Sequence, residues 1–534
     1  MTDVEGRGPS LDAQPVDLRE PPVLVEAAAL LEPGSTEVSA LTAAVGAFAQ
    51  HVLVTSRSAP TVWPSDPEVH ATPAGVVLRD GPETPDATQD RTSQPPSSRE
   101  LGVTESPRDI SSTLDVLTRR VWQSGVNTRS PGYLGYLPAG GLYAAALGDF
   151  LGSVLNPYSA MESISPGAAE LEQVVVQWLC EAVGLPVGSS GTLTSGGSSA
   201  TLTAVVAARD WMGVQPQDAG ACSVYVGEHR HHSVDRALRF AGLGGCPVRV
   251  VPSDGNHRMD SVALRRLLSV DATSGLRPWL VVATAGTTGS GSIDPLDDVV
   301  SAARDAGAWV HVDAAYGGLF ALAPEARPRL RGLGDADSVT VDPHKTLFLP
   351  YGTGAILVRD PQVLTSTFSH DASYLPARPP LSHGCGADAQ DGPGAVPSPA
   401  DLGMELTRPF RALGLWLPLQ LSGVQAFRDA LSEKLNLARS FHAALAEHRL
   451  FRVGPIPDLT VATYRAAPAG IDGDSFNQEL ARRLQQSGQV YVTTTVLQGR
   501  VTLRAAIGSA YTHEDHLLRA VATIVATAER LADG

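Results

Sequence analysis

Short apolar runs alternate with stretches of helical periodicity between about residues 168 and 360. The runs are almost continuously apolar, and predicted helices over 234–240, 261–268 and 296–306 separate most of them. Continuous apolar strands that alternate with helices are typical of a mostly parallel sheet buried on both faces. The sequence therefore predicts an α/β fold with central strands over residues 223–226, 248–251, 279–284, 309–312, 338–341 and 354–358.

Other segments flank this α/β pattern. Residues 1–30 are predicted to be disordered, because they are rich in Pro, Asp, Glu and Gly. Two helices are expected before the sheet, over 36–55 and 110–123, with a proline-rich linker over 82–107 between them. The tail is expected to form helices and strands over 413–448, 459–464, 490–495, 500–507 and 514–531. The predicted parts are an N-terminal helical segment, a large domain and a small C-terminal α+β domain, over 31–143, 144–412 and 413–534.

The charge balance excludes some partners. The chain has 534 residues, with 40 Lys and Arg against 56 Asp and Glu, for a net charge of −16. Nucleic acid and anionic membranes both need a basic face, so we expect neither as the main partner. We expect no apolar run as long as the roughly 20 residues that a membrane helix needs. The polar first 20 residues and four scattered cysteines favour a cytoplasmic protein with reduced thiols.

Lys345 and Asp313 are the main candidates for chemistry. Asp313 ends one predicted core strand, and Lys345 follows another in the run Asp342-Pro-His-Lys345. Ligands of such sheets gather beyond the carboxyl ends of the strands, so the two side chains should lie near each other. A lysine amine can form a Schiff base with the aldehyde of pyridoxal 5′-phosphate, while a carboxylate keeps the pyridine nitrogen protonated. The pair therefore indicates a pyridoxal phosphate site.

Other residues fit the remaining parts of that cofactor. Gly197 and Ser198 lie in a Gly/Ser turn before a predicted helix, where free N–H groups can bind a phosphate. Thr287 follows another core strand, and its hydroxyl is expected to reach a cofactor oxygen. Ala315 is small enough to pack against a flat ring.

His231 belongs to the cluster Glu228-His-Arg-His-His-Ser233, which follows a predicted strand. Three histidines suggest a metal site, but their spacing matches no standard tetrahedral set and no cysteine lies close in sequence. We therefore expect no metal, and we expect the His231 imidazole to stack on the cofactor ring. A solvated histidine cluster at a helix start remains the alternative.

Several motifs in the same order resemble those of the group II pyridoxal-phosphate-dependent amino acid decarboxylases, a family of fold type I. The resemblance runs from about Ile110 to Leu531. The motifs that carry it are Asn127–Gly141, Ser165–Glu172, Thr194–Thr201, His231–Ala237, His311–Ala315, Asp342–Lys345 and Tyr491–Gly499 with Leu503-Arg504.

The resemblance implies further roles. A tyrosine on a flexible loop protonates the substrate carbon after CO₂ leaves, and the segment Ala372-Ser-Tyr374-Leu-Pro376 makes Tyr374 the candidate. His344 would contact the substrate carboxylate or the cofactor. The substrate is expected at Tyr136, Leu137 and Pro138. The resemblance also implies a homodimer with active sites at the subunit interface.

The expected reaction is decarboxylation of an L-amino acid, aromatic or related, to an amine and CO₂. Tyr374 favours plain decarboxylation, because related aldehyde synthases carry phenylalanine there. A decarboxylating oxidase or an aminotransferase on the same fold remains the alternative. A catalytically silent scaffold protein is a further one, which the intact Lys345, Asp313 and Tyr374 oppose.

Overall fold

The computed structural model describes residues 31, 33–63, 100–369 and 397–533 of the chain. The chain divides into two compact units, Met1–Thr55 with Ala71–Trp122, and Ser56–His70 with Gln123–Gly534. The first unit contains most of helix α2 (Ser35–Ser58), together with α4 (Ile110–Leu117) and a π-helical turn at Thr118–Trp122. These elements confirm the two predicted N-terminal helices, while the predicted domain boundaries stay predictions.

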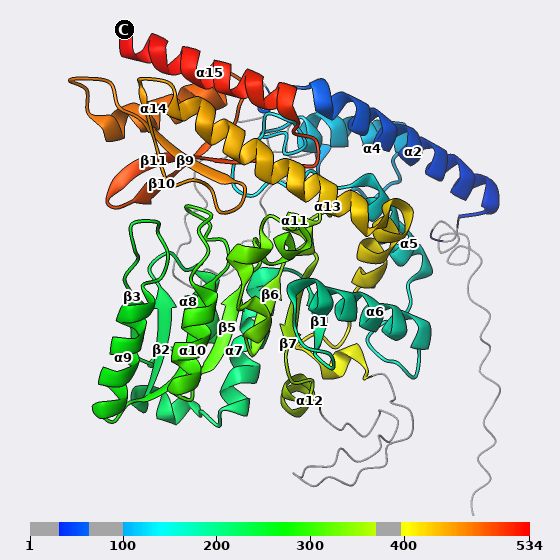
Figure 1. The fold of residues 1–534 in the computed structure, drawn as a ribbon. Coiled ribbons are helices and arrows are strands. Elements are labelled where there is room, and N and C mark those ends of the chain that lie inside the picture. The colour runs from blue at the N-terminus through cyan, green and yellow to red at the C-terminus, as the bar shows by residue number, and fades with distance from the viewer. Residues whose placement is uncertain (1–30, 32, 64–99, 370–396, 534) are drawn as a thin grey trace, which may run out of the picture. The chain divides into compact units, whose positions relative to one another are not determined.

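The second unit is built on a seven-stranded sheet with the order β1-β7-β6-β5-β4-β2-β3 (Figure 1). Only β7 runs antiparallel to its neighbours in this sheet, β1 on one side and β6 on the other. The predicted mostly parallel sheet is thus confirmed. Its strands are β1 (Ser190–Thr194), β2 (Cys222–Gly227), β3 (Val248–Val251), β4 (Arg277–Thr284), β5 (Trp309–Asp313), β6 (Ser338–Val341) and β7 (Gly354–Val358).

Both faces of the sheet are buried, as the apolar runs predict. Along β4, Val281 and Ala283 join one hydrophobic cluster, while Leu280 and Val282 join another on the opposite face. Burying each such valine or leucine side chain stabilises the fold by roughly 1.5–3 kcal/mol. One face packs on α6 (Pro166–Val183), α9 (Ser261–Thr273) and α10 (Leu296–Asp305), and the other on α7 (Gly197–Trp211), α8 (Ser233–Phe240) and α12 (Gln362–Phe368).

The C-terminal part is an antiparallel four-stranded sheet with the order β10-β11-β9-β8. It shares a hydrophobic cluster with three helices, which confirms the predicted α+β character. The elements are α13 (Arg411–Ala446), β8 (Phe451–Val453), β9 (Val461–Ala466), α14 (Gly473–Gln486), β10 (Thr493–Leu497), β11 (Arg500–Ala506) and α15 (Glu514–Asp533).

Two details differ from the sequence predictions. Helix α13 is not continuous, because Gly423 has φ +71° and ψ 154°, and Pro418, which lies before it in the helix, removes a backbone donor. Helix α2 is, among the described residues, the one helix that is long and apolar enough to cross a membrane by length and composition. The prediction that no segment meets this criterion was therefore wrong.

A buried ion pair fixes the chain just before α13 to the first strand of the large sheet. Arg408 Nη2 lies 2.8 Å from Glu172 Oε1, and the two side chains are 2% and 5% exposed. Arg408 also donates hydrogen bonds to the Thr192 hydroxyl and the Leu193 carbonyl. These contacts join α6, β1 and the segment that leads into α13.

We expect Arg408→Ala to lower the free energy of unfolding by about 3–5 kcal/mol, because it leaves the Glu172 carboxylate buried and unpaired. Urea denaturation of the purified protein measures this change. The control is Arg265→Ala, whose partner Asp305 forms an exposed pair and which should cost below about 1 kcal/mol. Equal losses in the two variants would contradict the prediction.

Candidate active site

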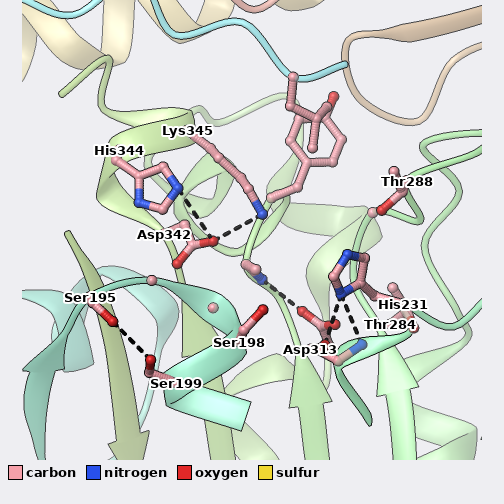
Figure 2. A pocket seen from close by; sticks show the side chains of 17 residues that line it. Ser195, Ser198, Ser199, His231, Thr284, Thr288, Asp313, Asp342, His344 and Lys345 are labelled. Carbon is pink, nitrogen blue, oxygen red and sulfur yellow. Dashed lines mark hydrogen bonds and ion pairs between the residues drawn. The ribbon is translucent and has the colours of Figure 1, made fainter. Parts of the chain in front are cut away.

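The residues that follow five strands of the large sheet line one cavity of about 270 Å³ (Figure 2). Parallel strands bring their carboxyl ends to the same edge, and this edge is where α/β proteins bind ligands. The cavity receives side chains or backbone from beyond β1, β2, β4, β5 and β6. The structure therefore brings together Gly197, Ser198, His231, Asp313, Ala315 and Lys345, which the sequence assigned to one site.

Lys345 lies on α11, a single helical turn at Pro343–Thr346. Pro343 occupies the first turn of this short helix, where its missing N–H costs nothing. The Lys345 Nζ atom lies 2.9 Å from Asp342 Oδ2, and the lysine side chain is 27% exposed. The amine is thus held at the wall of the cavity, where it can react with an aldehyde.

Asp313 is the last residue of β5 and is 7% exposed. Its Oδ1 accepts a hydrogen bond from the Ala315 N–H at 3.2 Å. Two residues earlier on the strand, burial lowers the pKa of His311 to about 4, so this imidazole is neutral at neutral pH. Asp313 therefore faces the cavity without a protein cation bound to it among the described ion pairs, and it can pair with a protonated pyridine nitrogen.

His231 follows β2 and lies across the cavity near Asp313 (Figure 2). Its Nδ1 accepts a hydrogen bond from the Ser233 N–H at 3.2 Å and lies 2.8 Å from the Ser233 hydroxyl. The Nε2 atom therefore carries the ring proton of the neutral imidazole. Burial lowers the pKa of His231, which keeps the ring neutral and suited to stacking on a flat heterocycle.

The turn between β1 and α7 is shaped for an anion. Gly196 has φ +145°, a conformation that favours glycine, and α7 has no side-chain cap at its start. The first N–H groups of the helix are therefore free to bind phosphate oxygens. A Cβ at Gly197 would lie 2.8 Å from Asp342 Oδ2 and 3.2 Å from Ala315 Cβ, so only glycine fits this approach.

The loop after β4 presents Thr288 rather than Thr287 to the cavity. Thr287 is buried, and its hydroxyl lies 2.7 Å from the Ser290 hydroxyl and accepts the Ser292 N–H. The Thr287 side chain, which was predicted to contact the cofactor, therefore forms hydrogen bonds within the loop and does not line the cavity.

The predicted substrate residues are only partly at the cavity. Leu137 lines it, whereas Tyr136 is 62% exposed and Pro138 lines a small adjoining space. Tyr136 has φ +50°, and its carbonyl accepts a hydrogen bond from Arg504. His344 lines the cavity, and its Nδ1 donates to the Thr353 carbonyl at 2.7 Å, which directs Nε2 towards the site.

Some site residues were missed from the sequence, and one prediction cannot be placed. Tyr374 lies outside the described residues. Asp342 and Tyr316 line the cavity but were not assigned roles. The spacing of Asp342 and Lys345, three residues apart across a proline, was the available signal for the first. Among the described residues, no group of three or more His, Cys, Asp or Glu side chains is placed to hold a metal ion.

The arrangement fits pyridoxal 5′-phosphate. An amine, a buried carboxylate, a flat neutral imidazole and a turn with free N–H groups surround one space. Lys345 would bind the aldehyde carbon, Asp313 the ring nitrogen, and the turn at Gly197 and Ser198 the phosphate. The fold and site thus define an α/β enzyme of pyridoxal phosphate chemistry.

Comparisons with known proteins narrow this class. Residues 97–465 match the pyridoxal-dependent decarboxylase conserved domain. The chain is 30% identical over 433 residues to an aromatic-L-amino-acid decarboxylase of Bacillus atrophaeus, covering 80% of this chain and 88% of that protein. It is 27% identical over 427 residues to a phenylacetaldehyde synthase of Arabidopsis thaliana, covering 78% and 85%. A solved structure of Oryza sativa TDC with PLP and tryptamine superposes with a TM-score of 0.80 at 26% identity, covering 93% of this chain and 99% of that one.

The chain therefore belongs to the pyridoxal-dependent decarboxylase family. Its cofactor is pyridoxal 5′-phosphate and its substrate is an amino acid, as the resemblance implied.

The buried His311 makes stability sensitive to acid. Its folded pKa of about 4 lies below the ordinary value of 6.5, so the unfolded chain binds more protons between these values. We expect stability to fall as the pH drops from 6.5 to 4, by about 3 kcal/mol from this group. In His311→Gln, urea denaturation over this pH range should show a correspondingly smaller loss. An unchanged pH dependence would argue that His311 is protonated in the folded protein.

Proposed function

We propose that this enzyme converts an aromatic L-amino acid to the corresponding amine and CO₂. The observation that carries the proposal is that Lys345, Asp313 and His231 line one cavity. The aromatic preference is supported by the names of the similar proteins of Bacillus atrophaeus and Arabidopsis thaliana.

Bound pyridoxal phosphate supplies an electron sink for the bond to the carboxylate carbon. The protein's part is to hold groups in place and to exclude water. Asp313 would keep the ring nitrogen protonated, and the His231 imidazole would pack against the ring. His344, whose pKa is lowered by burial, offers a neutral Nε2 at the same cavity wall for polar contact with the substrate.

The final proton transfer to the substrate carbon distinguishes an amine-forming decarboxylase from an aldehyde synthase. We assign it to Tyr374, whose phenol can donate a proton to the substrate carbon. A decarboxylating aldehyde synthase is the second candidate, because a phenylacetaldehyde synthase is among the similar proteins. The tyrosine at position 374 favours amine formation.

We also propose a cytoplasmic homodimer that does not bind membranes. Helix α5 (Tyr143–Leu155) exposes Phe150, Val154 and Leu155 at 51%, 64% and 67%. Large apolar side chains gathered on one surface are typical of a protein interface. In the other unit, α2 also exposes apolar residues, at Val38, Val45 and Val54, which supports burial against a second copy. The net charge of −16 opposes binding to anionic lipid.

The substrate proposal is tested with L-tyrosine, L-tryptophan, L-phenylalanine, L-glutamate and L-lysine. We expect kcat/KM for the preferred aromatic substrate to exceed that for glutamate and lysine by about 100-fold or more, because a site shaped for a ring leaves charges unpaired. CO₂, amine, ammonia and H₂O₂ are measured together, with Lys345→Ala as the inactive control. Equal amounts of amine and CO₂ without ammonia support the proposal, whereas aldehyde with ammonia and H₂O₂ identifies an aldehyde synthase.

The dimer is tested by sedimentation velocity without detergent. We expect the native chain to sediment as a dimer and Val154→Asp to shift it towards monomer, since a carboxylate would have to be buried at the interface. The control is Val262→Asp, a change on the exposed side of α9. A native chain that sediments as a monomer would contradict the dimer. If the protein co-sediments with added lipid vesicles, it binds membranes and that part of the proposal is wrong.

A further inference from the structure

Asp342 is a second buried carboxylate at the cavity, and the reaction outlined above does not use it. It follows β6 directly, is 1% exposed, and places Oδ2 2.9 Å from Lys345 Nζ. Asp313 occupies the end of the neighbouring strand β5, so the cavity has two acids but one lysine. The second acid needs a reason to be there, because burying an uncompensated carboxylate is costly.

The Asp342 carboxylate cannot easily move to another partner. A Cβ at Gly354 would lie 2.6 Å from its Oδ1, and a Cβ at Gly197 would lie 2.8 Å from its Oδ2. Two glycines thus leave just enough room for the carboxylate between β7 and the start of α7. Its Oδ1 is buried and has no hydrogen-bond partner among the described atoms.

Lys345 is the cation that compensates Asp342. Among the described residues, only Lys345 and His344 place a basic side-chain nitrogen within 4 Å of its carboxylate, and His344 Nε2 is the more distant at 3.8 Å. Burial lowers the pKa of His344, so this ring adds no charge at neutral pH. The positive charge of Lys345 therefore neutralises the negative charge of Asp342 on this side of the cavity.

During turnover, Lys345 must alternate between a form bonded to the cofactor carbon and a released form. When an amine substrate arrives as its ammonium ion, its nitrogen forms a bond to the cofactor carbon and the bond from that carbon to Lys345 breaks. The incoming nitrogen keeps one of its three protons and passes two to Lys345 Nζ, which already carries one, so Lys345 becomes a free ammonium group and charge and atoms balance. That group has three N–H donors and a localised charge, whereas the bonded nitrogen has at most one N–H.

We propose that Asp342 is a positioning residue that holds the Lys345 ammonium group whenever the lysine is released from the cofactor. Its carboxylate favours the released form and thereby favours exchange of Lys345 for the incoming amine. The same contact keeps Nζ at the cavity wall, from which it returns to the carbon when the product leaves. This role rests on the pyridoxal phosphate chemistry of Lys345 and not on the preferred substrate side chain.

The test replaces the carboxylate by an amide of the same shape, Asp342→Asn. Methylamine is titrated into the holoenzyme, and the equilibrium constant for displacement of Lys345 is read from the change in cofactor absorbance. Methylamine has no side chain, so the result is independent of whether the enzyme prefers aromatic amino acids. We expect displacement to become about tenfold weaker in Asp342→Asn, because the released ammonium loses its counter-charge. Displacement of equal or greater strength would overturn the proposal.

A matched control is Asp271→Asn. Asp271 is 2% exposed and pairs with Arg249 at 2.8 Å, but it lies on α9 and does not line the cavity. This variant tests the general effect of removing a buried acid, and it should leave the methylamine equilibrium unchanged. An equal weakening in both variants would attribute the effect to loosened packing and would overturn the proposal.

A second measurement needs no cofactor. Thermal unfolding of the cofactor-free protein is compared for Lys345→Ala, Asp342→Asn and the double variant. We expect Lys345→Ala to lower Tm by about 2 °C, since it leaves Asp342 unpaired, and we expect Asp342→Asn to restore Tm in that background. Strictly additive changes in Tm would show that the two side chains are not coupled, and would reject the contact on which the proposal rests.

Discussion

Burial of two carboxylates at the ends of adjacent strands is the constraint from which the site follows. Asp313 and Asp342 are 7% and 1% exposed, and each needs a positive partner in a poorly hydrated space. Lys345 serves Asp342 from three residues along the chain. Asp313 has no such ion pair among the residues that the structure describes, and the pyridine nitrogen of the cofactor is the partner that fits it. One cation supplied by the protein and one supplied by the ligand thus account for the chemistry of the cavity.

The main site could be predicted because its residues directly follow predicted strands. Lys345, Asp313 and His231 need only the rule that parallel strands end at the same edge. Thr287 shows where this rule stops being sufficient. One residue along a turn decides which hydroxyl faces the cavity, and here the Ser290 hydroxyl and the Ser292 N–H hold Thr287 on the inner side. Those contacts depend on the folded turn and have no local pattern in the sequence.

The fold shows the same division between local and long-range information. Strands such as β4 and β5 are continuous apolar runs, so their existence and faces were predictable. The place of β7 between β1 and β6 was not, because apolar content does not specify strand order or direction. The break in α13 at Gly423 was also missed, since the flanking helical periodicity outweighs a single glycine. Asp342 was missed because attention to the lysine alone overlooks the acid one helical turn before it.

The antiparallel strand β7 has a consequence for how the chain folds during synthesis. Ser190 on β1 pairs with Val358 on β7, and Thr194 pairs with Gly354, so β1 has no neighbour in the sheet until β7 has been made. The phosphate-binding turn that follows β1 therefore acquires its shape late, together with the close approach of Gly354 to Gly196. Pairing over such a long separation in sequence is slow. A partly synthesised or truncated chain that ends before β7 would carry the lysine without a place for the phosphate, and it could not retain the cofactor.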